Sequence, residues 1–214
     1  MADWATIGSL ATAAGTLVLA GATYSSVRSA NRSARIAERT LLLGLRPVLV
    51  SSREDDRAES VSWYGRHHAL VPGGRAHLEE SDGAVYIAIN LRNVGAGLGV
   101  LQGWHLSDEP PRGRREHPPV EEFRRQVRDL YIAAGDTGFW QTSLRDGDDQ
   151  LARDLRDAIA ADRALSLYLL YGDHEGGQLT ISLFGLIAGE GDERLAEIGR
   201  HWTLDTPDPR MRAE

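Results

Sequence analysis

Residues 4–27, WATIGSLATAAGTLVLAGATYSSV, decide how the rest of the chain is organised. Tyr24 carries the only ionisable side chain in these 24 residues. As a helix the stretch would be about 36 Å long, which is enough to cross a hydrocarbon core of roughly 30 Å. The sequence therefore predicts a single transmembrane anchor over residues 1–27, with the rest of the chain attached to it.

Small side chains recur at helical spacing inside this stretch. They form one stripe, which consists of Gly8, Thr12, Thr16 and Ala20. Small residues let two helix backbones approach closely in lipid, so the stripe is a candidate surface for homo-oligomer formation. The high content of Ala, Gly, Thr and Ser also leaves open a soluble helix that packs in a bundle.

The residues that follow the uncharged stretch are basic. Four arginines line one face of an expected amphipathic helix over residues 28–46: Arg28, Arg32, Arg35 and Arg39. Positive flanks stay in the cytoplasm, so the N-terminus is expected outside the plasma membrane and the domain inside. Trp4 and these arginines are the expected membrane-interface residues. Gly44 and the residue before Pro47 predict the end of the helix.

The remaining chain has the pattern of one mainly β domain. Ala84–Asn93 is its clearest strand, because apolar residues alternate with others along it. Further strands are expected at 47–52, 61–64, 68–71, 100–106, 130–133, 139–144, 165–171, 178–187 and 200–205, and short helices at 120–129 and 149–162. We therefore predict a β-sandwich over residues 47–206 and a flexible tail over 207–214.

Composition and charge exclude several functions. The chain has no cysteine, which excludes disulfides, thiolate metal sites and cysteine catalysis. Residues 1–46 contain five arginines and two acidic residues, whereas the rest of the chain contains 19 arginines and 29 acidic residues. A domain this acidic argues against nucleic-acid binding, which needs a basic surface for the phosphates.

Short motifs give the chain a family resemblance. In order they are the N-terminal span, a basic helix, LRP (residues 45–47), LRNVGAG (91–97), AAGDTG (133–138) and YGDHEGGQLTISL (171–183). The arrangement resembles a group of uncharacterised, mostly actinobacterial, single-span membrane proteins with an immunoglobulin-like β-sandwich domain. The resemblance implies architecture and location, and it brings no catalytic residues. The long segment over residues 107–129 departs from the compact pattern of that group.

The glycine-rich stretch GAGLG (residues 95–99) follows a strand, as a dinucleotide-binding loop would. Its spacing is G-x-G-x-G rather than G-x-G-x-x-G, and no helical pattern follows it. We therefore expect no cofactor there, and predict a bend or β-bulge in which glycine supplies positive φ.

Histidines and acids gather between residues 67 and 82. They are His67, His68, His77, Glu79, Glu80 and Asp82. Imidazole and carboxylate groups bind zinc, so the segment is compatible with a metal-dependent hydrolase. No pair has the i, i+4 helical spacing of a specific zinc motif, and we therefore expect exposed loop histidines and no metal.

Two further acidic segments are interpreted as turns. DGDD (residues 146–149) lacks the glutamate of a calcium loop and is expected to feed a helix cap. Asp173, His174 and Glu175 lie in a predicted hairpin turn, and no G-x-S-x-G motif supplies a nucleophile for them. Trp63, Trp104, Trp140 and Trp202 are expected to fill the core.

Together these patterns predict a membrane-anchored, non-enzymatic interaction or scaffold protein that presents a cytosolic β-sandwich. Its expected partners are the lipid bilayer and another protein, and no cofactor is expected. One alternative is a metal-dependent hydrolase that uses the cluster over residues 67–82. The other is a soluble assembly component with a helical-bundle N-terminus.

Overall fold

The computed structural model describes residues 3–64, 67–110, 116–145, 150–191 and 193–205. The expected tail over 207–214 and the DGDD segment over 146–149 lie outside this part of the chain, as do the side chains of Trp4 and Arg39. The chain divides into two compact units, residues 1–44 and residues 45–214.

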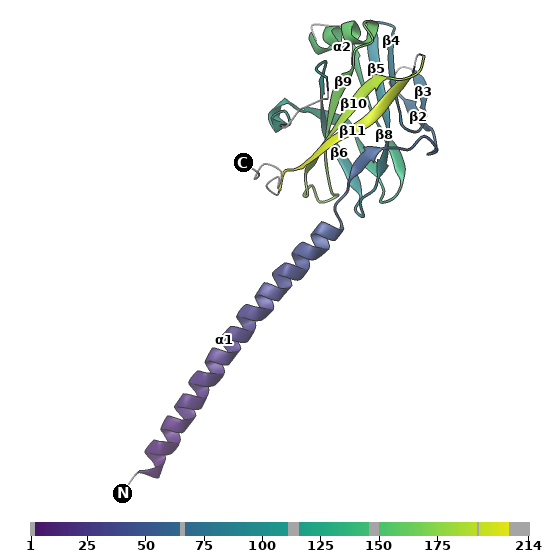
Figure 1. Ribbon diagram of the computed structural model, residues 1–214. Coiled ribbons are helices and arrows are strands. Elements are labelled where there is room, and N and C mark those ends of the chain that lie inside the picture. Colours follow the sequence, from purple (N-terminus) through teal and green to yellow (C-terminus); the bar gives the residue numbers. More distant parts are fainter. Residues whose placement is uncertain (1–2, 65–66, 111–115, 146–149, 192, 206–214) are drawn as a thin grey trace. The chain divides into compact units, whose positions relative to one another are not determined.

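The first unit is one continuous helix, α1 (Trp4–Gly44), of 41 residues (Figure 1). It ends at Gly44, as the glycine and the following Pro47 predict. Every α1 side chain that the structure describes is exposed, including the large apolar ones: Leu10, Leu17, Val18, Leu19, Val27, Ile36 and Leu41. No helix among the described residues is both long and apolar enough to span a membrane.

The hydroxyl groups of α1 are bonded within the helix. Thr12 Oγ1 donates to the Gly8 carbonyl at 2.9 Å, and Thr16 Oγ1 donates to the Thr12 carbonyl at the same distance. Thr23 Oγ1 donates to the Leu19 carbonyl at 2.8 Å. These donors therefore need no water to be satisfied.

The second unit is mainly β, which confirms that part of the predicted fold. Its elements are β1 (Leu49–Ser51), β2 (Glu59–Ser62), β3 (His68–Val71), β4 (Arg75–Ser81), β5 (Ala84–Asn93), β6 (Gly99–Ser107), η1 (Val120–Glu122), β7 (Arg124–Ile132), β8 (Thr137–Arg145), α2 (Gln150–Ala160), β9 (Leu165–Gly172), β10 (Thr180–Ala188) and β11 (Arg194–Thr203). The helix predicted over 120–129 is wrong: only three residues form a 3₁₀ turn there, and β7 follows.

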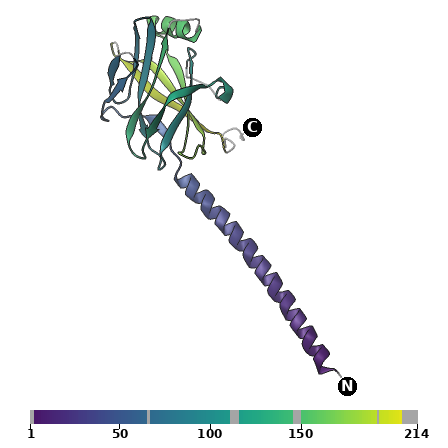
Figure 2. The same cartoon turned by 180° about the vertical axis from the view of Figure 1, so that it is seen from behind.

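Nine of these strands form one curled antiparallel sheet. Its order is β1-β5-β4-β11-β10-β9-β6-β7, and β8 pairs with the other edge of β5. The ladder between β11 and β4 is short in the described part of the chain: Arg194 pairs with Ala76 and Leu195 with Arg75. The half of the sheet that contains β9, β10 and β11 lies in front of β5 and β8 in Figure 1 and behind them in Figure 2. β2 and β3 form a separate two-stranded sheet.

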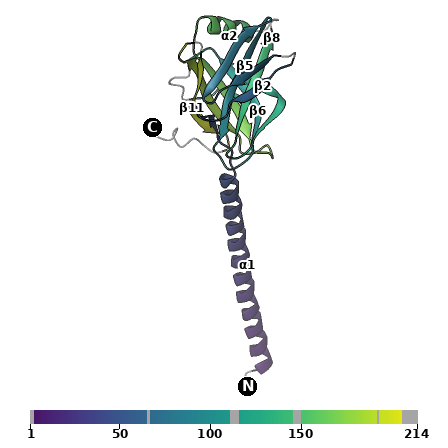
Figure 3. The same ribbon diagram turned by 90° about the vertical axis from the view of Figure 1, so that its right-hand side faces the viewer.

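The main core lies between the two halves of the curled sheet. Fully buried Trp140 and Phe184 are among its largest side chains, and Leu155 of α2 closes one end. Figure 3 shows α2 at that end of the domain. Trp63, Trp104, Trp140 and Trp202 are all buried, as the sequence predicts.

β5 is the strand that the alternating pattern predicts, and it is buried on both faces. Val85 and Ile87 face the main core, whereas Tyr86 and Ala88 pack in a second cluster with Trp63. A third cluster covers the outer face of β9 and β10, where Phe123 packs against it. The segment before β7 thus helps to shield the outside of the sheet, which protects apolar area that would otherwise face water.

The glycines of GAGLG are required by a close backbone approach. A Cβ on Gly97 would lie 1.7 Å from the Leu45 carbonyl oxygen, and one on Gly95 would lie 2.3 Å from the Arg46 carbonyl oxygen. None of the three glycines has positive φ, so the predicted cause of the bend is wrong. The side chain of Asn93 holds this region together through four hydrogen bonds to backbone groups.

Tyr171→Phe is expected to lower the free energy of unfolding by about 1–3 kcal/mol, because a buried backbone donor loses its acceptor. The Leu49 N–H donates to the Tyr171 hydroxyl at 3.1 Å, and that hydroxyl lies 2.8 Å from Ser182 Oγ. Urea unfolding followed by circular dichroism measures the change. The exposed Tyr131→Phe is the matched control and is expected to have little effect.

The same variant should alter stability at alkaline pH. Burial raises the pKa of Tyr171 above its ordinary value of about 10. The folded state then keeps the phenol proton after the unfolded state has lost it, so the stability from this group is present below that value and is lost as pH rises above it. Between pH 9 and 11, roughly the range of tyrosine ionisation, the free energy of unfolding should therefore fall less for Tyr171→Phe than for the wild type.

Candidate functional site

Three of the predicted cluster residues come together beside the two-stranded sheet. His67 directly precedes β3. Its backbone carbonyl accepts a hydrogen bond from the Trp63 backbone N–H at 3.0 Å, and this bond fixes the position of His67. His77 and Glu79 lie two residues apart on β4, so their side chains leave the same face of the strand. The topology thus brings His67 of the β2–β3 hairpin close to His77 and Glu79 of the main sheet, whose side chains can also bind a metal ion.

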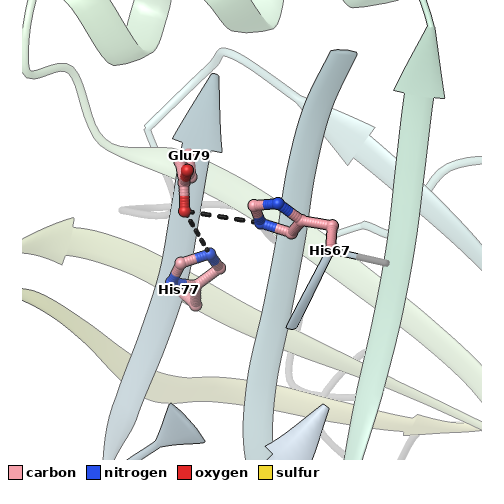
Figure 4. Close-up of side chains that lie close together, drawn as sticks. All are labelled: His67, His77 and Glu79. Carbon is pink, nitrogen blue, oxygen red and sulfur yellow. Dashed lines mark ion pairs between the residues drawn. The ribbon is translucent and has the colours of Figure 1, made fainter. Parts of the chain in front are cut away.

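Both imidazoles point at one carboxylate oxygen (Figure 4). Glu79 Oε2 lies 3.4 Å from His67 Nε2 and 3.2 Å from His77 Nε2. The three ligand atoms all lie within 4.8 Å of one another. Both Nε2 atoms are buried, and the polar neighbour that they share at ion-pair distance is the Glu79 carboxylate.

Aromatic rings surround the two histidines. His67 stacks on Tyr86 with ring centroids 3.8 Å apart, and the Trp63 ring lies 5.3 Å from His67 and 5.8 Å from His77. The side chains of His67 and His77 are only 17% and 24% exposed. The expectation of exposed loop histidines is therefore wrong for this pair, because the hairpin covers them.

The charge state of His77 follows from this burial. Desolvation lowers the pKa of His77 below its ordinary value, and the nearby Glu79 only partly opposes that effect. The neutral imidazole is thus favoured, and a neutral ring nitrogen is the form that binds a metal ion.

The other members of the predicted cluster lie elsewhere. His68 is exposed and its Nδ1 lies 2.8 Å from Ser62 Oγ. Glu80 pairs with Arg156 of α2 at 2.8 Å, and Asp82 occupies the β4–β5 turn with a φ of 51°. The signal in the sequence is the spacing of His77 and Glu79, because two residues that lie two positions apart on a strand face the same side.

The predicted hairpin turn at Asp173 is confirmed. The Asp173 carboxylate accepts the N–H groups of Glu175 and Gly177 at 3.1 and 2.8 Å, so it organises the turn. Because this carboxylate already accepts two backbone hydrogen bonds, Asp173 has a structural role in the turn.

A second feature is a groove of about 600 Å³ between β7 and β8. Its lining includes three arginines, Arg124, Arg125 and Arg128, and no acidic residue among those that the structure describes. The Arg124 guanidinium lies 5.5 Å from the centre of the Trp104 ring. Sequence reasoning missed this surface because residues 120–129 were expected to form a helix.

Along this groove, part of β7 is not paired with the neighbouring strand β6. The ladder with β6 jumps from Leu101–Leu130 to Gly103–Arg125, so residues 126–129 do not pair with β6. Val127 is 93% exposed, and Tyr64 on the opposite side is 87% exposed. The groove therefore combines positive charge with accessible apolar side chains.

The predicted helix-association residues all lie on α1. Gly8, Thr12, Thr16 and Ala20 are exposed, as are the predicted interface residues Arg28, Arg32 and Arg35. Nothing in the first unit covers these side chains, so the stripe and the basic face are both available to other molecules.

No protein-family model and no curated protein matches the chain. Among solved structures, similarity is found to one described as the crystal structure of a protein from Archaeoglobus fulgidus. It has 12% sequence identity and a TM-score of 0.25, and the similarity covers 60% of this chain and 93% of that chain.

Proposed function

We propose that the chain is a membrane-anchored, non-enzymatic interaction protein. The observation that supports this most directly is the uncharged part of α1, whose described apolar side chains are all exposed. Leu17, Val18 and Leu19 occupy successive positions and therefore point to different sides of the helix. These three positions cover about 200° of the helix, and apolar side chains on more than one side suit lipid better than a single partner helix.

The bonded hydroxyl groups support insertion as well. A free hydroxyl donor in hydrocarbon would be costly, but Thr12, Thr16 and Thr23 donate to carbonyls of their own helix. The arginines that follow the span support a cytoplasmic domain by the positive-inside rule, and in this proposal they contact anionic head groups of the plasma membrane.

We interpret the second unit as a variant of the immunoglobulin-like β-sandwich. Its two halves enclose one core and are joined by a short ladder between β11 and β4, so we treat each half as one layer. Two layers around one core support this interpretation. In this proposal the domain presents the groove between β7 and β8 to a partner protein.

The charge of the groove specifies the partner chemistry. Three arginines in the lining attract an anionic segment, and Val127 and Tyr64 offer apolar contacts. We therefore propose that the partner contributes an extended acidic segment with interspersed apolar side chains.

Subcellular fractionation tests the anchor. The full chain should sediment with membranes, resist an alkaline carbonate wash and dissolve only in detergent. Recovery of the chain in the soluble fraction, without detergent, would reject the anchor and favour a soluble assembly.

Arg125→Glu combined with Arg128→Glu is expected to weaken acidic-peptide binding at least tenfold, roughly the effect of reversing a close charge pair. The probe is a fluorescent peptide of alternating glutamate and valine, measured by anisotropy with the detergent-solubilised full chain. Arg153→Glu combined with Arg163→Glu, at sites outside the groove, is the matched control. Equal binding by both double variants would reject the groove as the docking site.

A further inference from the structure

His67, His77 and Glu79 form an unassigned site on the second unit. We propose that these three side chains bind one zinc ion, with water as the fourth ligand. The proposal is independent of membrane anchoring and of the partner groove, because it concerns a different cluster of residues.

The separations between the ligand atoms fit zinc. Zinc binds imidazole nitrogen and carboxylate oxygen at about 2.0–2.2 Å, so two ligand atoms of a tetrahedral site lie roughly 3.3–3.6 Å apart. Glu79 Oε2 lies 3.2 Å from His77 Nε2 and 3.4 Å from His67 Nε2. Both nitrogen–oxygen separations therefore match a tetrahedral zinc site, and the two nitrogens lie within 4.8 Å of each other.

The two ring nitrogens share one polar neighbour at ion-pair distance, the Glu79 carboxylate oxygen. His67 Nε2 and His77 Nε2 are buried, and a buried polar atom is normally hydrogen-bonded. With each ring protonated on Nδ1, both Nε2 lone pairs face the same space beside the Glu79 carboxylate. A zinc ion in that space satisfies both nitrogens and the oxygen.

The donor set selects the type of metal. Two imidazoles and one carboxylate suit zinc and other first-row transition metals, whereas magnesium and calcium prefer oxygen ligands. Trp63 and Tyr86 restrict access to the nitrogens and provide an apolar shell. Glu79 is 43% exposed, so solvent reaches the carboxylate of the site.

Metal binding has a structural consequence for the domain. His67 belongs to the hairpin of β2 and β3, whereas His77 and Glu79 belong to β4 of the main sheet. An ion held by all three would fix the hairpin on the sheet. Zinc should therefore stabilise the fold as well as bind to it.

The first measurement is zinc content after equilibrium dialysis of the full chain in detergent, without a polyhistidine tag. One zinc per chain is expected, and zinc at about 100 times its dissociation constant should raise the midpoint of thermal unfolding by about 5–10 °C. His67→Ala, His77→Ala and Glu79→Gln should each weaken binding at least tenfold, roughly the lower end of what loss of site residues costs.

His68→Ala is the matched control, since His68 is adjacent in sequence and lies outside the cluster. It should keep one zinc per chain and the full thermal shift. Folded wild-type protein that retains no zinc would overturn the proposal, and so would unchanged binding in the His67→Ala and His77→Ala variants. The wild-type result decides the matter even if a variant fails to fold.

Discussion

Asn93→Ala is expected to lower the free energy of unfolding of the β domain by about 3–5 kcal/mol, because several buried backbone groups lose their partners together. Asn93 Oδ1 accepts the N–H groups of Val48 and Gly95 at 3.1 and 3.0 Å. Its Nδ2 donates to the Gly97 and Ile132 carbonyls at 2.7 and 3.0 Å. One fully buried amide thus joins the start of β1, the glycine loop and the end of β7.

Urea unfolding of the full chain in detergent measures the loss, with β-sheet circular dichroism as the signal. Asn31→Ala makes the same chemical change on an exposed position of α1 and should leave the unfolding of the β domain unchanged. If Asn93→Ala lowers the free energy of unfolding by less than about 1 kcal/mol, water has replaced the amide. Backbone groups that bond to water instead of Asn93 lose little free energy.

Much of the fold was predictable because its signals are local. The apolar run of β5 and the glycine turn after β9 can be read from neighbouring residues. β4 was missed because its sequence, RAHLEES, is polar: the strand exists through its ladder with β5, which is a tertiary contact. Similarly, β7 was expected to be partly helical because pairing with β6 is not visible in its own sequence.

The candidate zinc site shows the same limit. The alternation of His77 and Glu79 could have placed both on one face of a strand, but only if the strand had been predicted. His67 reaches them because the hairpin folds over β5, where Trp63 packs against Tyr86 with ring centroids 5.4 Å apart. That packing depends on residues far apart in the sequence, so sequence spacing alone pointed to an exposed loop.

Leu17→Arg combined with Val18→Arg is expected to transfer the chain from the membrane to the soluble or aggregated fraction. Both residues lie near the middle of the uncharged stretch, where α1 has exposed apolar side chains. An arginine at the centre of a span costs about 2.5–3.5 kcal/mol, and the lost apolar side chains add about 0.5 kcal/mol each, so insertion becomes about 6–8 kcal/mol less favourable. Carbonate extraction followed by immunoblotting measures the distribution.

Ile36→Arg combined with Ala37→Arg is the matched control, because it adds the same charge to exposed positions of α1 beyond the uncharged stretch. This variant should remain with the membrane, since arginines on the cytoplasmic flank are favourable there. If both double variants behave as the wild type does in the carbonate wash, lipid does not hold the middle of α1. If the wild type is a soluble oligomer that Leu17→Arg and Val18→Arg dissociate, the exposed side chains pack against other helices and the chain is an assembly component.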